Sequence, residues 1–400
     1  MTGGVAGRDV AVVTPWYPTS QLPFRGAFVR TMVAATAPGC DRVTIYHCDE
    51  WPARVTPAQE AALSRAHAAL LPRASRVREE GGGAWVSYLP VPVPRGLTYP
   101  ELARRHEQAL GQALGGAALD ASVVHAHQGL PSGWAVLPRL RPDARLVVTE
   151  HASFLDRILS QPGGLGMYEA VLSRCAALFA VGTAVRDRLA AALPEHAHKI
   201  SMVPNAISFD EPRPAPVTEL RRWLYVGALN AHKGVPLLLE AFAKCRAEDP
   251  GLTLTLVGEG ELAQPLAKRA AELGLSEAVT FTGAVPPDEA LRLMREHDLL
   301  VHASRSETFG VAVVEAVAAG LPVLVTRCGG PEQTLAGIEG AAGELIAVEE
   351  SEGSLVEGYR RLRDRFPHGL DLPLAQRTLD QRYGFPAVAR AHHRVWFGEG

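Results

Sequence analysis

The chain has 400 residues, of which 47 % are hydrophobic and 21 % are charged, and its 38 Gly and 30 Pro are scattered along it. This composition excludes a disordered, collagen-like or coiled-coil protein. At roughly 150 residues per domain, the length predicts two or three domains. The formal net charge is −3, which argues against a nucleic-acid-binding protein held by phosphate contacts.

The five cysteines are far apart and include no Cys-x-x-Cys pair, which indicates a reducing compartment without disulfides or structural zinc. The N-terminal residues lack an apolar leader core, and no stretch of about 18 uncharged apolar residues follows. We therefore expect a cytoplasmic protein. Residues 1–200 carry 20 basic and 16 acidic residues, a small excess that suits at most a peripheral contact with the inner face of a membrane.

Short apolar runs recur through the first half of the chain, each followed by a turn and an Ala- or Leu-rich stretch. Because successive residues are apolar, these runs suit strands buried on both faces, and their alternation with helices predicts a parallel sheet. The predicted strands are Val10–Thr14, Val43–Tyr46, Ser122–His125, Leu146–Thr149 and Ala177–Val181.

A long loop follows the first predicted strand and ends at Gly26, just before a helix. A glycine there allows the backbone to approach a ligand closely. The loop also contains Trp16, Tyr17 and Phe24, whose side chains suit stacking on a sugar face. Packing of these three side chains in the core is an equal alternative.

Histidines mark the ends of two further predicted strands, with His125 and His127 in one segment and His151 in the next. The carboxyl edge of a parallel sheet is where α/β enzymes place functional groups. No third ligand follows at a suitable spacing, so we expect no metal site. For His151 a functional role is weighed against that of a satisfied core histidine.

The segment 210–216 has three prolines in five residues, which is too stiff for the interior of a strand or helix. We place the linker between two domains there. A second series of predicted strands follows it: Trp223–Val226, Leu252–Val257, Ala278–Phe281, Leu299–Val301 and Pro322–Val325. Two such series predict two doubly wound domains.

Glycines close the first two strands of the second series, at Gly227 and Gly258, and a Lys233-Gly234 pair precedes the first helix. Lysine is rare in this chain, which makes Lys233 conspicuous. The four lysines are Lys199, Lys233, Lys244 and Lys268.

The segment 304–316 leads from a predicted strand into a helix, with Glu307 in the turn and Glu315 about two helical turns further on. Unpaired N–H groups at the helix start, near Phe309 and Gly310, attract a phosphate group together with the helix dipole. A carboxylate further along accepts hydrogen bonds from the two adjacent hydroxyls of a ribose. The alternative is that Glu307 only caps the helix and Glu315 faces solvent.

This segment resembles the retaining family-4 glycosyltransferases, which have the GT-B fold, with two Rossmann-like domains facing each other across a cleft. Their most specific signature is Glu-x7-Glu, with Phe-Gly after the first Glu and Ala after the second. Glu307, Phe309-Gly310 and Glu315-Ala316 match this signature, and the following Gly-Leu-Pro-Val at 320–323 is also similar.

The resemblance implies a donor site for a nucleoside diphosphate sugar. In it Lys233 neutralises the diphosphate, Glu307 holds the sugar hydroxyls and Glu315 the ribose, while His151 contacts the sugar near the reacting carbon. We take His151, Glu307 and Lys233 as the catalytic residues. The donor-binding residues implied are Gly26, Gly227, Lys233, Gly258, Val285, Glu307, Phe309, Gly310 and Glu315.

One departure from the family concerns Ala228, which stands where an Arg usually shares the contact with the diphosphate. Loss of a cation from a dry site costs on the order of a hundredfold in rate unless another supplies its charge. The sequence offers Arg305, His232 and Arg327 as substitutes and does not choose among them.

We therefore expect a metal-independent, cofactor-free retaining hexosyltransferase that uses a small-molecule, glycan or lipid-linked acceptor and occurs as a monomer or homodimer. The expected domains are residues 1–208, joined by a terminal helix at about 383–400, and residues 209–382. Three alternatives remain: a nucleotide-sugar epimerase, an enzyme that couples two cyclitols through nitrogen, and an inactive partner subunit.

Overall fold

The computed structural model describes residues 7–19, 22–53, 77–78, 83–94 and 96–398. The chain divides into two compact units. The N-terminal unit comprises residues 1–19, 25–204 and 388–400, and the C-terminal unit comprises residues 20–24 and 205–387. The division at Pro204 lies a few residues before the predicted boundary, and the proline-rich segment 210–216 is irregular in structure.

The N-terminal unit is built around a sheet whose strand order, among the described residues, is β3-β4-β2-β1-β5-β6-β7-β8. All neighbouring strands are parallel except β3 and β4, which are antiparallel. The strands are β1 (Asp9–Thr14), β2 (Arg42–Ala53), β3 (Val77–Arg78), β4 (Ala84–Pro94), β5 (Val123–His127), β6 (Arg145–Glu150), β7 (Ala177–Ala180) and β8 (Ile200–Met202).

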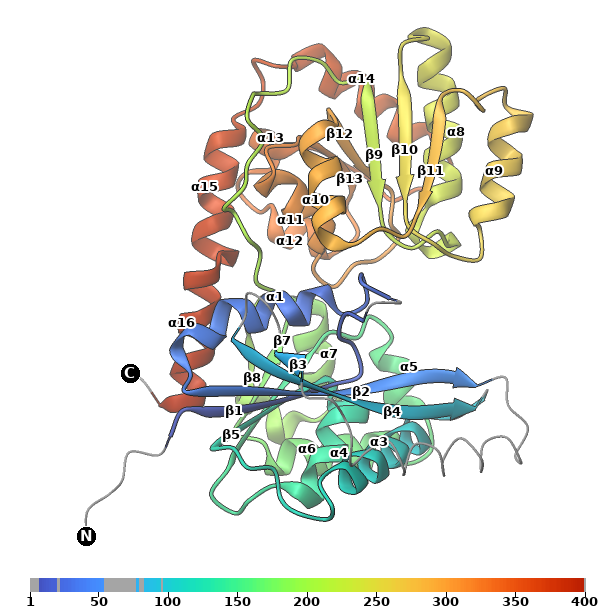
Figure 1. Ribbon diagram of the computed structural model, residues 1–400. Helices are drawn as coiled ribbons and strands as arrows, with labels where there is room; N and C mark the ends of the chain where they lie inside the picture. The colour runs from blue at the N-terminus through green and yellow to red at the C-terminus, as the bar shows by residue number, and fades with distance from the viewer. Residues whose placement is uncertain (1–6, 20–21, 54–76, 79–82, 95, 399–400) are drawn as a thin grey trace. The chain divides into compact units, whose positions relative to one another are not determined.

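Helices cover both faces of this sheet, with α1 and α16 on one face and α3, α4 and α6 on the other (Figure 1). Successive side chains of a strand point to opposite faces of the sheet. Val10 and Val12 of β1 therefore pack with α1 on one face, and Ala11 and Val13 pack in the core with α3 on the other. The helices of the unit are α1 (Ala27–Thr36), α3 (Tyr99–Ala113), α4 (Trp134–Val136), α5 (Leu155–Ser160), α6 (Gly164–Arg174), α7 (Thr183–Ala192) and, from Val388 on, α16 (Phe385–Phe397).

Strand β4 contains prolines at alternate positions, Pro90, Pro92 and Pro94. Residues two apart in a strand direct their backbone groups to the same side. The carbonyl of Pro92 accepts a hydrogen bond from the Arg105 side chain at 3.3 Å. Among the described residues β3 pairs with β4 only at Trp85 and Val86, so the proline-rich part of β4 lies at the edge of the sheet, where prolines are tolerated.

The C-terminal unit contains a parallel sheet in the order β11-β10-β9-β12-β13-β14, again counted over the described residues. Its strands are β9 (Arg222–Val226), β10 (Thr253–Val257), β11 (Val279–Gly283), β12 (Leu299–His302), β13 (Val323–Thr326) and β14 (Gly343–Ile346). The helices that flank it are α8 (Val235–Glu248), α9 (Ala263–Glu272), α10 (Pro287–Glu296), α11 (Val311–Ala318), α12 (Gly330–Thr334), α13 (Glu339–Ala342), α14 (Gly353–Arg365) and α15 (Leu372–Tyr383).

The core of the C-terminal unit centres on Trp223 of β9, which is fully buried. Its ring meets those of Phe242 in α8 and Tyr359 in α14 at centroid distances of 5.5 and 4.7 Å, both edge to face. This packing anchors β9, the strand after which Lys233 follows. Helices α8 and α14 thus hold β9, a central strand, from one face of the sheet, and this fixes the start of the segment that carries Lys233.

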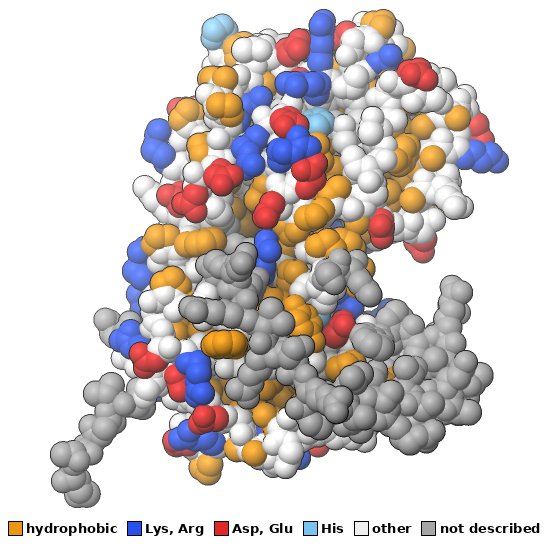
Figure 2. Space-filling model, viewed as in Figure 1, with side chains coloured by type: hydrophobic (Ala, Val, Ile, Leu, Met, Phe, Trp, Pro, Cys, Tyr) orange, Lys and Arg blue, Asp and Glu red, His pale blue; other side chains and the backbone are white. Residues whose placement is uncertain are grey.

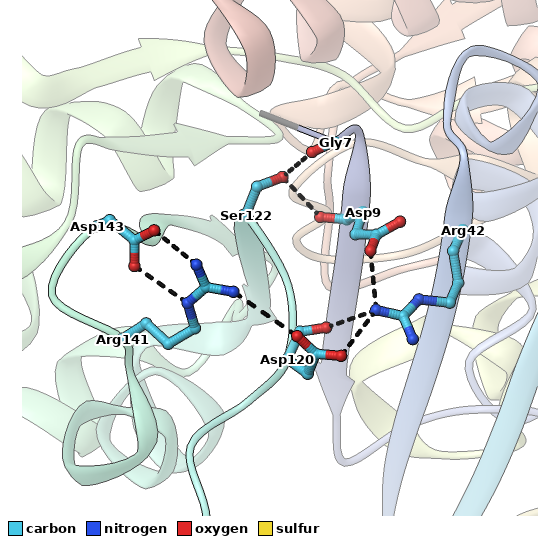
Figure 3. Close-up of polar contacts among 7 residues, drawn as sticks. All are labelled: Gly7, Asp9, Arg42, Asp120, Ser122, Arg141 and Asp143. Carbon is cyan, nitrogen blue, oxygen red and sulfur yellow. Dashed lines mark hydrogen bonds and ion pairs between the residues drawn. The ribbon is translucent and has the colours of Figure 1, made fainter. Parts of the chain in front are cut away.

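Ion pairs join the amino ends of the strands in the N-terminal unit (Figure 3). Arg42 at the start of β2 contacts Asp9 Oδ2 at 2.8 Å and Asp120 Oδ2 at 3.1 Å, and Arg141 contacts Asp143 at 2.6 Å. These side chains are largely exposed, so each pair contributes about 0–1 kcal/mol. The network ties strand starts together at the edge opposite the carboxyl ends.

The face of the C-terminal unit seen in Figure 2 carries Lys and Arg side chains interspersed with Asp and Glu side chains. Ion pairs such as Arg269 with Glu240 at 2.6 Å and Arg361 with Glu344 at 2.9 Å are typical of the unit. Within the described part of the chain, none of the helices has the length and apolar character needed to cross a membrane.

Candidate active site

In each sheet the strand order reverses at one point, and open α/β sheets bind ligands at that point, outside the carboxyl ends of the strands. In the C-terminal unit β9 lies between β10 and β12. The segment after β9 carries Lys233, and the segment after β12 carries Glu307. Two of the predicted catalytic residues thus follow the pair of strands where a ligand is expected.

The structure brings Lys233 and Glu307 into direct contact. Lys233 Nζ lies 2.5 Å from Glu307 Oε1, and His302 Nε2 donates to the same oxygen at 2.9 Å. Burial alone would raise the pKa of Glu307, but the hydrogen bond and charge of His302 and those of Lys233 lower it to about 2. Glu307 is therefore an ionised hydrogen-bond acceptor at neutral pH.

The loop from β12 to α11 is held in place by β13 and α12. Glu307 donates its backbone N–H to Cys328 O and accepts from Gly330 N, each at 2.9 Å. Gly310, the residue directly before α11, has a φ of 83°, a left-handed conformation that glycine adopts readily. No side chain caps α11, so the N–H groups of its first turn are available to an anion.

Glu315 lies inside α11 and is half-buried. Its carboxylate makes no hydrogen bond or ion pair with any residue that the structure describes. Burial raises its pKa to about 7. A partly buried carboxyl with a raised pKa is a candidate for ligand binding, so the ribose contact of Glu315 stays a prediction beside the alternative of a solvent-facing side chain.

Two predicted glycines lie against each other where β9 and β10 end. A Cβ placed on Gly258 would come within 1.8 Å of the carbonyl oxygen of Gly227, so a larger residue cannot occupy this position. Val285 follows β11, next to β10, and is half-buried. Phe309 is buried against Tyr383, with ring centroids 5.1 Å apart, which leaves only its backbone to face a ligand.

The structure distinguishes the three residues that the sequence offered as substitutes for a cation at Ala228. Arg305 forms a two-pronged ion pair with Glu350 at 2.9 and 2.5 Å, and His232 Nε2 lies 3.2 Å from the carbonyl oxygen of Ser306. Arg327 is exposed directly after β13, and its side chain has no ion-pair partner among the described residues. Of the three, Arg327 is therefore the residue whose positive charge is not paired with another described side chain.

In the N-terminal unit His151 follows β6 as predicted and belongs to a row of imidazoles. Its Nε2 lies 2.9 Å from His127 Nδ1, and the two rings are stacked at a centroid distance of 5.2 Å. Burial, with the charge of His392 as a smaller cause, lowers the pKa of His151 to about 3. The ring is thus neutral at physiological pH, with Nδ1 unpaired among the described residues.

Glu150 fixes the backbone around His151. Its fully buried carboxylate accepts from the N–H groups of His151 and Ala152 through Oε1, at 2.9 and 2.7 Å. Through Oε2 it accepts from Gly129 N at 3.0 Å and from Tyr168 Oη at 2.5 Å. Burial raises the pKa of Glu150, and these four donors oppose that rise.

The remaining residues predicted near the first loop differ in burial, and one of them, Phe24, belongs to the C-terminal unit. Gly26 lies directly before α1 against the backbone of Trp16. Tyr17 is buried in the core, whereas Trp16 is half-buried and Phe24 is exposed. The predicted site residues therefore form two groups, His151 and Gly26 in the N-terminal unit and the others in the C-terminal unit.

Sequence reasoning missed His302 and Glu150. His302 is the last residue of an apolar strand, and Glu150 is the last residue of another. A polar residue at the end of a buried strand is the signal that marks both positions.

Family models match the two units in turn. The model described as Glycosyltransferase Family 4 matches residues 66–211, and the model described as Glycosyl transferases group 1 matches residues 209–364. The glycogen synthase of Mycobacterium tuberculosis is 30 % identical over 285 residues, which are 68 % of each chain. A D-inositol 3-phosphate glycosyltransferase of Nocardia farcinica is 33 % identical over 180 residues, which are 43 % of this chain and only 37 % of that protein.

The solved structure of the Anabaena protein HepE in complex with UDP has the same fold. It is 17 % identical, covers 98 % of this chain and 100 % of its own, and has a TM-score of 0.68. The predicted fold class, GT-B with two Rossmann-like domains, is thereby confirmed. The chain belongs to the family 4 glycosyltransferases with the GT-B fold.

Proposed function

We propose that this glycosyltransferase moves a hexose-type sugar from a nucleoside diphosphate sugar to an acceptor hydroxyl, with retention of configuration and without a divalent metal. The observation that carries the proposal is the contact of Lys233 with an ionised Glu307, next to the uncapped start of α11. Lys233 and the start of α11 suit the negative charge of a diphosphate, and the Glu307 carboxylate suits the hydroxyl groups of a sugar. The complex of HepE with UDP supports a nucleotide donor.

The donor phosphates are placed at the start of α11, where Lys233 and the backbone N–H groups after Gly310 offset their charge. Glu307 accepts hydrogen bonds from the sugar hydroxyls, which suits a carboxylate that stays ionised. Glu315 accepts from the ribose hydroxyls. The tight turn of Gly227 and Gly258 brings backbone to the nucleotide, and Val285 borders the base.

The chemical step breaks the bond between the anomeric carbon and the phosphate oxygen. The acceptor oxygen bonds to the same face of that carbon, and its proton passes to the departing phosphate. Lys233 and the helix start stabilise the negative charge that develops on the diphosphate. The neutral His151 ring donates or accepts a hydrogen bond at the sugar without adding charge. The absence of an Asp-x-Asp motif supports charge neutralisation by these groups.

The experiment is a transfer assay with a panel of uridine, guanosine and adenosine diphosphate sugars and a mixture of acceptors. Lys233→Ala and Glu307→Gln are expected to lower the rate about a hundredfold or more while thermal unfolding stays that of a folded protein. Lys244→Ala is the matched control, because Lys244 pairs with Glu352 on the surface. Near-normal rates in either site variant would contradict the assignment of these residues.

A further inference from the structure

A cavity of about 550 Å³ lies along α3, and its described lining shares no residue with the candidate active site. One wall is a face of α3, where Arg104, Gln108, Gly111 and Gln112 line the cavity. These positions are three or four residues apart, so they lie on the same side of a helix. The other wall is formed by Arg139, which follows α4.

The cavity lies toward the amino ends of the strands of the N-terminal unit. Helix α3 ends at Ala113, and the segment after it leads into the start of β5. Arg139 precedes the start of β6, and its carbonyl accepts a hydrogen bond from Leu119 N at 2.8 Å. The candidate active-site groups follow the carboxyl ends of their strands instead. A ligand in this cavity is therefore bound away from the reacting groups.

Arg139 carries a positive charge that no carboxylate of the described chain pairs. Its Nη1 donates to Gly116 O at 2.6 Å, whereas its Nε is shielded from solvent and lacks an acceptor among the described residues. The guanidinium packs against Gly111, where a Cβ would come within 3.0 Å of Nη2. Glycine is unfavourable inside a helix, and here it leaves room for the guanidinium. Arg141, two residues further on, is by contrast paired with Asp143 at 2.6 Å (Figure 3).

Arg104 is a second cation of the lining without a partner. It is exposed on α3, and its side chain forms no hydrogen bond or ion pair with any residue that the structure describes. Glu101, one turn earlier, accepts from Thr98 N and Thr98 Oγ1, each at 2.8 Å, in the helix cap. The charge of this carboxylate acts on Arg104 without an ion-pair contact. The Arg104 guanidinium is therefore available to a ligand.

The remaining polar groups of the lining suit hydroxyl groups. Gln108 and Gln112 present exposed amides, and Glu107 accepts from Trp134 Nε1 at 2.8 Å through one carboxylate oxygen, which leaves the other. Two guanidinium groups match the charge of a phosphate monoester, which approaches −2 at neutral pH. The volume corresponds to about eighteen water molecules in the liquid, so it holds more than a phosphate group alone.

We propose that this cavity binds a phosphate monoester of a small hydroxylated molecule. Arg139 and Arg104 donate to the phosphate oxygens, and the amides of Gln108 and Gln112 bind the hydroxyl groups. Inorganic phosphate shares the charged part of this chemistry and lacks the hydroxylated part. The proposal does not depend on the proposed function, because it rests on side chains remote from the transfer site.

The test titrates glycerol monophosphate and inorganic phosphate into the full chain by calorimetry, at low ionic strength because salt screens exposed charges. We expect the ester to bind more tightly than the inorganic ion. Arg139→Gln and Arg104→Gln each remove a charge-assisted contact and are expected to weaken binding of the ester roughly tenfold. Arg188→Gln, the same change at an exposed arginine of α7 that pairs with Asp156, is the matched control and is expected to leave the affinity unchanged.

The same titrations on Lys233→Ala separate this cavity from the proposed donor site, which also takes phosphate groups. We expect Lys233→Ala to bind glycerol monophosphate as wild type does. A loss in Lys233→Ala with none in Arg104→Gln would assign the binding to the donor site and overturn the cavity proposal.

Three further results would contradict the cavity proposal: no binding of either probe, equal affinity for the two probes, or unchanged affinity in Arg104→Gln. Arg139→Gln also loses the contact with Gly116, which holds the segment after α3. Arg104 has an exposed side chain without a described partner, so Arg104→Gln is expected to stay folded and keeps the test decisive.

Discussion

The ionised Glu315 side chain lowers the free energy of unfolding, because burial raises its pKa from 4.5 to about 7. Between these two pH values the folded protein holds a proton that the unfolded chain has lost. The free energy of unfolding therefore falls as the pH rises through this window. The interval between the two pKa values corresponds to about 3 kcal/mol, an upper bound because the side chain is only half-buried.

The substitution Glu315→Gln removes the titrating group and keeps its size. At pH 8 the variant is expected to be more stable than wild type by up to about 3 kcal/mol, and at pH 4 the two are expected to be equal. Calorimetric melting of the full chain at several pH values measures the difference. Glu277→Gln, at an exposed position, is the control. A stability difference independent of pH between 4 and 8 would refute the reasoning.

The same variant also tests the ribose contact. If Glu315 accepts from the ribose hydroxyls, Glu315→Gln gains stability and loses nucleotide affinity at pH 8, by roughly tenfold for a charge-assisted hydrogen bond pair. Unchanged affinity would remove Glu315 from the donor site. A wild-type residue that lowers the stability of the fold and strengthens ligand binding is what is expected at a functional site.

Three further outcomes are expected. His302→Phe removes the hydrogen bond and charge that most lower the pKa of Glu307 and keeps a ring of similar size, so the acid limb of the pH–rate profile is expected to move to higher pH; an unmoved limb would contradict the role of His302. Tyr168→Phe removes a buried donor to Glu150 and is expected to cost about 1–3 kcal/mol in unfolding free energy, so a change below about 0.5 kcal/mol would show that this hydrogen bond is dispensable. Transfer activity is expected to survive excess EDTA, and loss of activity that Mg²⁺ or Mn²⁺ restores would contradict a metal-independent reaction.

The strands were predictable wherever both faces are buried, because such runs are apolar at every position. Trp223–Val226 and Leu299–Val301 agree with β9 and β12 to within one residue at each end. Strand β4 was missed because its prolines resemble a loop, and their tolerance depends on an edge that only the assembled sheet defines. Strand β14, only four residues long and beginning with Gly343, gave no apolar run.

The candidate site was predictable only in part. The turn before α11 placed Glu307 and Glu315, and the rarity of lysine drew attention to Lys233. The contact between Glu307 and His302 depends on a loop that returns toward its own strand, which has no periodic signal.

The central claim is that the C-terminal unit binds the diphosphate of a nucleotide sugar through Lys233. Isothermal titration of UDP, GDP and ADP into wild type and Lys233→Ala tests it directly. We expect wild type to bind at least one of these nucleotides and Lys233→Ala to bind it at least tenfold more weakly. The absence of binding for all three nucleotides, or equal affinity in the variant, would contradict the account.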